Sequence, residues 1–263
     1  MTSRARIFLA GDSTVAGRPR SMAPMAGWGQ ALPLFLRHTE VVNAARPGAS
    51  SRSFLERGRL SWILRNIAGD DLLLVSFGLI DMKRAEGRFT EPFHGYQHFL
   101  RRYVLGARAR GAHPVFVTSH ERRVFDRHGN MGRPLGLYPE AMRELAAALS
   151  VPLVDLNEWS IAQWRRQGPE GTRALFLHLR PGEHPNYPRG VADNTHLRGR
   201  GAVECARFVA REMCSKGLLA PEYFRDLDTR VAEMAVAFAD DRVVERLTRS
   251  RVGPTHETEM VPS

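Results

Sequence analysis

Residues 5–17 read ARIFLAGDSTVAG, an apolar run that stops at a glycine and continues with an acid and a hydroxyl residue. The run is typical of a buried strand, and Gly11 permits a tight turn directly behind it. Ser13 would then lie at the carboxyl end of that strand, where a helix is expected to begin. A serine in this position can simply cap the helix. It can also be part of a functional site, and the remainder of the chain decides between the two interpretations.

The first apolar run is followed by four more, which are separated by longer helical patterns. We predict strands over residues 5–11, 40–44, 71–77, 113–119 and 151–156. We predict helices over residues 28–38, 51–66, 93–110, 138–149, 157–167 and 199–215. Near-continuous apolar strands need both faces buried, so this alternation predicts an α/β fold, a three-layer α/β/α sandwich with a central five-stranded parallel sheet. In a flavodoxin-like strand order, the site lies at the carboxyl ends of the strands.

The chain has 263 residues, of which 43% are hydrophobic, and this suffices for one sizeable core. We assign residues 1–218 to the main domain, 219–250 to a C-terminal helical extension and 251–263 to a disordered tail. Within the extension, residues 221–249 read as one charged amphipathic helix. Such a helix could cover the flank of the sheet or form a homodimer contact.

The net charge of +10 raises the question of a nucleic-acid partner. All but two of the 38 basic residues are arginines scattered along the chain, so we expect no nucleic-acid binding. No apolar run of 18 residues and no cleavable leader is visible, which predicts a cytoplasmic protein without a membrane partner. Cys205 and Cys214 share one helical pattern and are expected to be free thiols, with a helix-to-helix disulfide as the alternative.

Two later segments bring further chemistry to the same edge of the predicted sheet. Gly48, in NAARPGASSRSF, precedes a helix start and can present its backbone N–H without a side chain in the way. Far downstream, DNTHLRGRGA sets Asp193 and His196 three residues apart. The acid can then orient the imidazole while the ring faces Ser13, which needs such a base because a free hydroxyl is a poor nucleophile.

Two other interpretations of the Asp193 segment stay open at this point. An Asp and a His at this spacing can belong to an ordinary surface turn. A metal site is also conceivable, because His178 and His184 precede Asp193 and His196 within twenty residues. These histidines lack the tight spacing of metal ligands, so we expect neither a metal nor another cofactor.

Taken together, GDSTV, NAARPGASSRSF, FGLID and ADNTHLRGRGA resemble the SGNH (GDSL-type) hydrolases, specifically the rhamnogalacturonan acetylesterase-like branch. The resemblance covers about residues 6–215. It implies that Ser13 is the nucleophile and that His196 is the general base, which later returns the proton to the leaving group. It also implies that Asp193 holds the imidazole in its tautomer, and that the backbone N–H groups of Ser13 and Gly48 are oxyanion donors.

The third block departs from the pattern of the family. The family carries Gly-His-Asn-Asp there, with the Asn side-chain amide as a third oxyanion donor, and this chain reads Gly78-Leu79-Ile80-Asp81. Ile80 cannot donate a hydrogen bond. Loss of one such donor typically costs about a hundred- to a thousandfold in rate.

Substrate contacts are expected from Asp12, Trp28, Asp81 and Tyr187, with a place in the core as the alternative for Trp28. Thr118, Ser119 and His120 end the fourth strand, and one of them could replace the lost donor or simply cap the following loop. Arg122 and Arg123 could bind an anionic substrate or be solvated surface groups.

Three functions fit these residues. The first is an esterase that removes a small O-acyl group, in particular O-acetyl, from a carbohydrate or natural product through a Ser13 acyl-enzyme. The second is an acyltransferase or tailoring enzyme that passes the same acyl group to an alcohol or amine. The third is a binding protein that kept the fold and lost efficient catalysis. The expected partner is a small-molecule or oligosaccharide ester.

Overall fold

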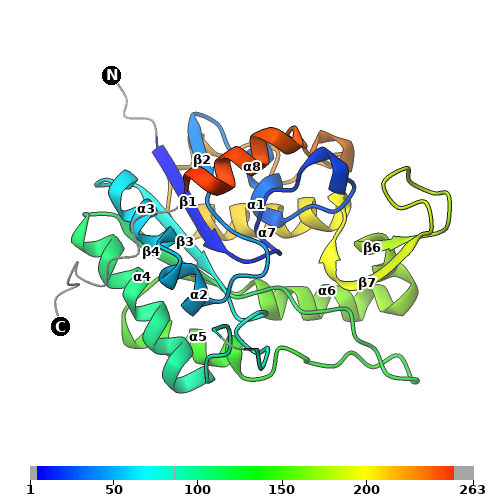
Figure 1. Ribbon diagram of the computed structural model, residues 1–263, viewed down its shortest axis with the longest axis horizontal. Coiled ribbons are helices and arrows are strands. Elements are labelled where there is room, and N and C mark those ends of the chain that lie inside the picture. The colour runs from blue at the N-terminus through cyan, green and yellow to red at the C-terminus, as the bar shows by residue number, and fades with distance from the viewer. Residues whose placement is uncertain (1–4, 86, 252–263) are drawn as a thin grey trace.

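The computed structural model describes residues 5–85 and 87–251 (Figure 1). Five strands form its central sheet: β1 (Ala5–Gly11), β2 (Thr39–Asn43), β3 (Leu72–Ser76), β4 (His113–Val117) and β5 (Leu153–Val154). All neighbours are parallel, and the order is β2-β1-β3-β4-β5. The predicted flavodoxin-like sheet is therefore confirmed.

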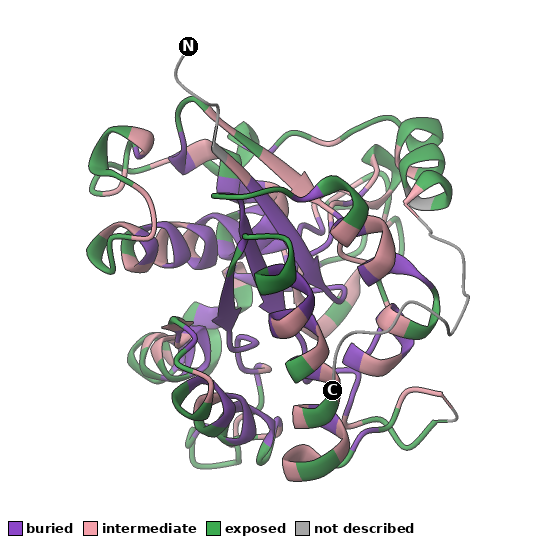
Figure 2. Cartoon of the chain, turned by 90° about the vertical axis from the view of Figure 1, so that its left-hand side faces the viewer, coloured by how far each residue is buried: buried purple, intermediate pink, exposed green. Residues whose placement is uncertain are grey.

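Helices cover both faces of the sheet because side chains alternate along each buried strand. In β1, Ile7 and Leu9 belong to one apolar cluster, whereas Phe8 and Ala10 belong to the other. The first cluster is completed by α1 (Trp28–Ala31), α6 (Leu156–Gly171) and α7 (Gly199–Ser215). The second is completed by α2 (Ser51–Glu56), α3 (Arg59–Asn66), α4 (Gln97–Ala109) and α5 (Tyr138–Ala148). Figure 2 shows the buried strands between these layers.

Several predicted helices are shorter or divided for local reasons. The predicted helix over 51–66 breaks between α2 and α3, where Gly58 adopts a left-handed backbone with φ +69°. The predicted helix over 28–38 keeps only α1, which runs into a 3-10 turn at Leu32–Phe35. Other short turns lie at Arg20–Met22, Pro92–Tyr96 (a π-helical turn) and Thr172–Ala174.

A two-stranded antiparallel ribbon, absent from the sequence-based prediction, stands apart from the central sheet. It consists of β6 (Phe176–Leu179) and β7 (Val191–Leu197). The segment of β7 contains Asp, Asn and Thr in a row, and such composition gives little sign of a strand. Both Asp193 and His196 lie on β7.

The prediction of one helix over 221–249 is wrong. That segment contains 3-10 turns at Pro221–Tyr223 and Glu233–Ala235, and only α8 (Asp241–Ser250) is an α-helix. Phe224 and Val236 are buried in the core. An extended chain reaches more of the core per residue than a helix, and this tertiary packing overrides the helical spacing of the apolar residues.

Two further predictions concern the C-terminal part of the chain. Apart from Arg251, the predicted tail over 251–263 lies outside the described residues. Cys205 and Cys214, both on α7, are free thiols as predicted. Within residues 5–85 and 87–251, the helices are all too short or too polar to cross a membrane.

Candidate catalytic site

Ser13 follows β1 in a tight turn at the carboxyl edge of the sheet. The N-cap interpretation is wrong, because it is Asp12, not Ser13, whose carboxylate accepts hydrogen bonds from Thr14, at 2.8 Å to both its N–H and its hydroxyl. The Ser13 hydroxyl instead meets His196, with 3.1 Å between Oγ and Nε2. This distance is within reach for proton transfer.

The other ring nitrogen of His196 is held by Asp193. Nδ1 lies 2.6 Å from Oδ2 of the carboxylate. The second carboxylate oxygen accepts the backbone N–H groups of Thr195 and His196 at 2.7 and 3.0 Å. Partial burial alone would raise the pKa of Asp193, but the hydrogen bonds from His196 and these N–H groups outweigh it and keep the pKa well below its usual range. The carboxylate is therefore ionised and fixes the imidazole tautomer that leaves Nε2 facing Ser13.

Arg122 and Arg123, after β4, hold the turn that carries the acid and the histidine. Arg122 Nε donates to the Thr195 hydroxyl at 3.0 Å. Arg123 donates to Asn194 twice, from its backbone N–H to the carbonyl at 2.8 Å and from Nη1 to Oδ1 at 3.0 Å. The surface interpretation does not fit these contacts, and binding of an anionic substrate stays a prediction. No sequence signal could have found them, because they join residues about seventy positions apart.

Two backbone N–H groups are available at the predicted oxyanion hole. Gly48 adopts a left-handed backbone with φ +76°, which favours glycine. Neither the N–H of Gly48 nor that of Ser13 donates to any described part of the chain. Their roles as donors stay predictions that this geometry allows.

The loop after β3, residues 78–81, supplies no side-chain hydrogen-bond donor for an oxyanion. Leu79 and Ile80 are both buried, yet they belong to none of the apolar clusters of the core. Gly78, which precedes them, has φ +130°. The loop thus carries hydrocarbon at the two positions where the family pattern that the sequence resembles has His and Asn.

Asp81 is a scaffold residue, which corrects its expected role in substrate binding. Its buried carboxylate accepts the N–H of Ser51 at 3.0 Å and the hydroxyl of Thr90 at 2.9 Å, together with the Ser51 hydroxyl and the Gly78 N–H. These contacts tie the loop after β3 to the start of α2. Burial raises the pKa of Asp81 to about 6, against the opposing effect of its hydrogen bonds.

Two more predicted contacts with substrate need correction. Asp12 is fully buried and shapes the nucleophile turn, and Trp28 is fully buried in the core. Tyr187 is half-buried and donates its hydroxyl proton to the carbonyl of Met22 at 3.0 Å. Its role at the entrance of the site remains a prediction.

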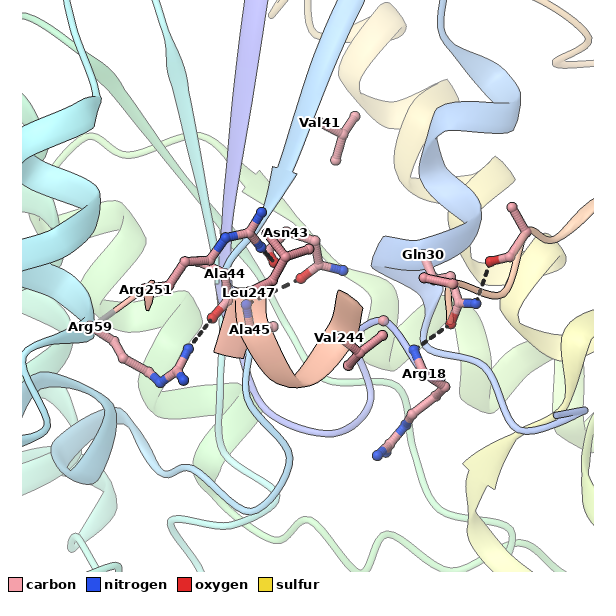
Figure 3. Close-up of a pocket in the computed structure, with 13 residues that line it drawn as sticks. Arg18, Gln30, Val41, Asn43, Ala44, Ala45, Arg59, Val244, Leu247 and Arg251 are labelled. Carbon is pink, nitrogen blue, oxygen red and sulfur yellow. Dashed lines mark hydrogen bonds between the residues drawn. The ribbon is translucent and has the colours of Figure 1, made fainter. Parts of the chain in front are cut away.

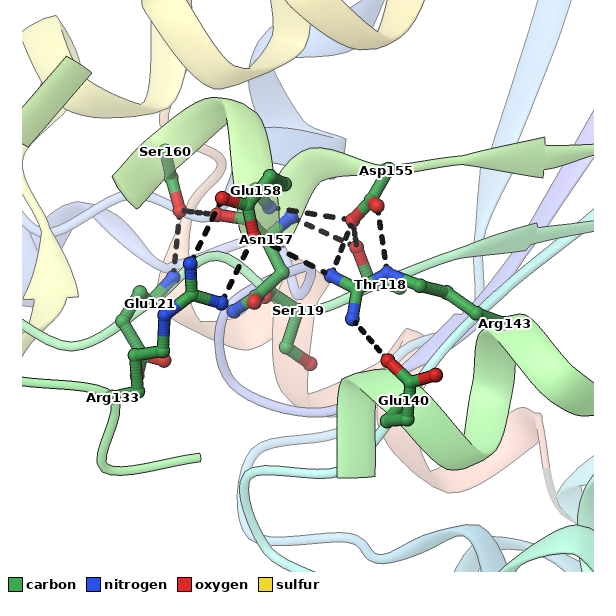
Figure 4. Close-up of polar contacts among 10 residues, drawn as sticks. All are labelled: Thr118, Ser119, Glu121, Arg133, Glu140, Arg143, Asp155, Asn157, Glu158 and Ser160. Carbon is green, nitrogen blue, oxygen red and sulfur yellow. Dashed lines mark hydrogen bonds and ion pairs between the residues drawn. The ribbon is translucent and has the colours of Figure 1, made fainter. Parts of the chain in front are cut away.

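The residues after β4 have hydrogen-bond partners within the protein. Figure 4 shows Thr118 bonded to Asp155, with Oγ1 2.9 Å from Oδ1. The Ser119 hydroxyl donates to the Phe77 carbonyl at 3.1 Å. His120 is buried, and its Nδ1 faces a backbone carbonyl at 3.1 Å, so Nδ1 carries the proton. Burial lowers the pKa of His120 to about 4, and the neutral ring leaves Nε2 only as an acceptor.

The histidines of the ribbon do not gather around a metal. His178 Nε2 lies 2.8 Å from Oδ1 of Asn194. Among the described residues, no three His, Cys, Asp or Glu side chains form a group that could hold a metal ion. The expectation of no cofactor is left as a prediction.

Comparison with known proteins identifies the family. Residues 9–201 match the GDSL-like lipase/acylhydrolase family, and the chain belongs to it, as an SGNH-type serine ester hydrolase. It is 47% identical to the rhamnogalacturonan acetylesterase RhgT of Bacillus subtilis (strain 168) over 214 residues, 81% of this chain and 91% of that protein. It is 38% identical to the probable rhamnogalacturonan acetylesterase YesY of the same organism over 217 residues, 81% of this chain and 94% of that protein. The rhamnogalacturonan acetylesterase-like branch is thereby confirmed.

Solved structures agree on the fold. The crystal structure of protein YxiM from Bacillus subtilis has a TM-score of 0.67 at 27% identity, and the match covers 82% of this chain and 57% of that longer chain. A catalytic mutant of the acetylxylan esterase Axe2 from Geobacillus stearothermophilus has a TM-score of 0.55 at 16% identity, with 81% and 94% covered.

Proposed function

We propose that the protein is a serine esterase that removes an O-acetyl group from a carbohydrate through an acyl-enzyme on Ser13. The observation that carries the proposal is the unbroken hydrogen-bond chain from Asp193 through His196 to Ser13. The names of RhgT and YesY support acetyl as the acyl group and a polysaccharide or oligosaccharide as the alcohol.

The reaction follows from the three side chains. His196 Nε2 takes the hydroxyl proton while Ser13 Oγ attacks the acetyl carbonyl carbon. The tetrahedral intermediate collapses as the bond to the sugar oxygen breaks, and His196 returns the proton to that oxygen. Water then attacks the acetyl-serine with His196 again as the base, and acetate leaves. Asp193, ionised throughout, stabilises the imidazolium that forms in each half-reaction.

The oxyanion of each intermediate would be stabilised by the N–H groups of Ser13 and Gly48 alone. Because Ile80 stands where the family has a donor, the chemical step is expected to be about a hundred- to a thousandfold slower than with three donors. That still leaves a working esterase, since the remaining donors and the triad act on the same atoms.

Acyl transfer is the second candidate, favoured by the buried hydrocarbon of Leu79 and Ile80. An apolar wall beside the acyl-enzyme disfavours entry of water and so extends the life of the intermediate. An alcohol or amine acceptor that binds in the site would then compete with hydrolysis.

The proposal is tested by intact-protein mass spectrometry of the wild type and Ser13→Ala. Each is incubated with an activated acetyl ester and, separately, with a serine-directed phosphonate. We expect adducts on the wild type and none on the variant. Acetate and acetylated acceptor, measured in the same reaction with added alcohols, then distinguish hydrolysis from transfer. An unlabelled wild type, under conditions that label a control esterase, would leave the binding-protein hypothesis in place of both.

A further inference from the structure

Residues 231–239, which we call the C-terminal strap, lie beyond the part of the chain that matches the family and contact both segments that carry the proposed catalytic groups. The first contact is with the segment that follows Ser13. The side-chain N–H of Gln30 donates to the Ala237 carbonyl of the strap at 2.7 Å (Figure 3). The side-chain oxygen of Gln30 accepts the backbone N–H of Arg18 at 2.9 Å. Gln30 thereby joins the strap to the chain just behind the nucleophile.

The second contact of the strap is with the start of α7, a few residues after His196. The Glu233 carboxylate accepts the backbone N–H of Arg200 at 3.1 Å. This N–H is one of the first four of the helix, which have no partner within the helix itself. Arg198, the N-cap residue, cannot cap the helix with its own side chain, because a guanidinium has no acceptor. The strap therefore supplies the cap, at the end of α7 where the helix dipole favours a negative charge.

The strap fits closely against this helix start. A Cβ atom added to Gly199 would lie 3.1 Å from the Glu233 carbonyl oxygen, so the two backbones approach each other as only glycine readily allows. Arg198 lies between two carboxylates, with Nε 3.6 Å from Glu233 and Nη1 3.5 Å from Glu183 on the loop between β6 and β7. Val236, which is buried in the core, anchors the strap. The strap, the helix start and the ribbon loop are thus in one connected set of contacts.

The contact between Ser13 and His196 depends on how their two segments are held. Oγ and Nε2 are 3.1 Å apart, and the residues are 183 positions apart in the chain. A misplacement of about 1 Å can cost about a hundredfold in rate. The Glu233 side chain is 43% exposed, and exposed contacts of this kind add little to global stability. Glu233 can therefore affect the geometry of the site and still be replaced without unfolding the protein.

We propose that the C-terminal strap holds the nucleophile segment and the histidine segment together, and that Glu233 is a positioning residue for His196, an inference that rests on the proposed esterase function. Glu233 acts through the Arg200 N–H and the first turn of α7, not by contact with the reacting atoms. Without its carboxylate, the first turn loses its cap and the chain that leads into it shifts. Nε2 of His196 then moves relative to Ser13, so the chemical step slows while substrate binding is unchanged.

The kinetic test compares Glu233→Ala with the wild type on a simple acetyl ester. We expect kcat to fall by about fivefold or more with KM unchanged, because the geometry of the reacting groups is disturbed. Glu233→Gln should recover most of this loss, since its amide oxygen can still accept the Arg200 N–H. Glu222→Ala is the matched control and should leave both constants unchanged. It removes the same charge from an exposed side chain that shows no hydrogen bond or ion pair among the described residues.

The other end of the strap is tested by Gln30→Glu. The new carboxylate can still accept the Arg18 N–H but can no longer donate to the Ala237 carbonyl, so the variant breaks only the bond to the strap. We expect a similar fall in kcat. The double variant with Glu233→Ala should lose little more than either single variant, because both changes release the same strap and their effects are then not additive.

A readout that needs no turnover is the NMR chemical shift of the His196 Nε2 nitrogen, measured at a pH where the ring is neutral. This shift reports the hydrogen bond that Nε2 accepts from the Ser13 hydroxyl, and Ser13→Ala gives its value when that bond is absent. We expect the signal of Glu233→Ala to move toward that of Ser13→Ala. The signal of Glu222→Ala should match the wild type. A residue that contributed only to stability would leave this shift in place, and thermal melting checks that each variant is folded.

Several results would overturn the positioning role. They are a wild-type kcat and a wild-type Nε2 shift in Glu233→Ala, equal effects in Glu233→Ala and Glu222→Ala, or a change in KM alone. Fully additive losses in the double variant would show that the strap does not act as one unit. Failure of the proposed function is recognised separately. A wild type that neither hydrolyses the ester nor reacts with a serine-directed phosphonate would refute the esterase, and the Nε2 shift would still test how His196 is held.

Discussion

The β7 segment Asp193–His196 and the loop Gly78–Asp81, which follows β3, both belong to the candidate site, yet they differ in their chemistry. In the β7 segment, the hydrogen bonds of the proposed triad run unbroken from the Asp193 carboxylate through His196 to the Ser13 hydroxyl. In the loop, the buried carboxylate of Asp81 is fully hydrogen-bonded, while the Ile80 side chain has no hydrogen-bond donor. Under the proposed function, the scaffold of this loop and its part in catalysis are separate properties, and each needs its own test.

The largest effect is expected from Asp193→Asn. The amide can no longer fix the imidazole tautomer or stabilise the imidazolium, so kcat should fall by about 10⁴-fold with little change in KM. Hydrolysis of a simple acetyl ester measures it, with circular dichroism as the check on folding. A loss below about tenfold would mean that Asp193 does not orient the imidazole as proposed.

Ile80→Asn tests the other region. If the loop lacks only the donor, turnover of acetyl esters should rise by about tenfold or more, toward the full contribution of one oxyanion-hole donor. Ile80→Leu is the matched control, since it changes shape without adding a donor. An unchanged rate in Ile80→Asn would show that another group already serves the oxyanion or that the site does no acyl chemistry.

Asp81→Asn tests the structural role of the Gly78–Asp81 loop independently of its role in catalysis. The side-chain NH₂ of the variant would face N–H and hydroxyl groups that now donate hydrogen bonds to the Asp81 carboxylate, and donors cannot bond to one another. The free energy of unfolding should therefore fall by about 1–3 kcal/mol. Denaturant titration measures this loss. Wild-type stability in the variant would refute the scaffold role.

The loss of unfolding free energy in Asp81→Asn should depend on pH in a predictable direction. The pKa of Asp81 is about 6 when folded, above the value of about 3.9 for an unfolded Asp, so the folded state binds the proton more tightly. The stability linked to this proton is fully present below pH of about 4 and is lost as pH rises through about 6. The deficit of Asp81→Asn relative to wild type should therefore be larger at pH 4 than at pH 7, and a constant deficit would contradict the raised pKa.

The smallest effect is expected from Arg123→Lys, which returns to the Asp193–His196 turn. Lysine keeps the charge and the backbone N–H but cannot reproduce the planar set of donors to Asn194, Thr172 and the Pro169 carbonyl. We expect kcat to fall by about five- to tenfold with KM unchanged, because the arginine positions the turn without touching substrate. An effect on KM alone would instead indicate contact with substrate.

The features that could be predicted from the sequence are those that local patterns of residues encode. Buried strands such as Leu72–Ser76 are apolar up to their last residue, and the glycines and hydroxyl residues at their ends mark one edge of the sheet. It could not predict the role of Arg123, whose partner Asn194 is 71 residues away. Nor could it predict the conformation of residues 221–249, where packing on the core outweighs the helical spacing.

The β6–β7 ribbon carries Asp193 and His196, so activity depends on how this ribbon docks against the rest of the protein. Ser13 and His196 are 183 residues apart; Ser13 follows a strand of the central sheet, whereas His196 lies on the ribbon. The ribbon is held to the body by contacts such as the Ala26 N–H to the Leu197 carbonyl at 3.0 Å. Side-chain bonds from Arg122 to Thr195 and from Arg123 to Asn194 hold it as well. Activity should therefore require that the ribbon stays docked, and not only that the central sheet is folded.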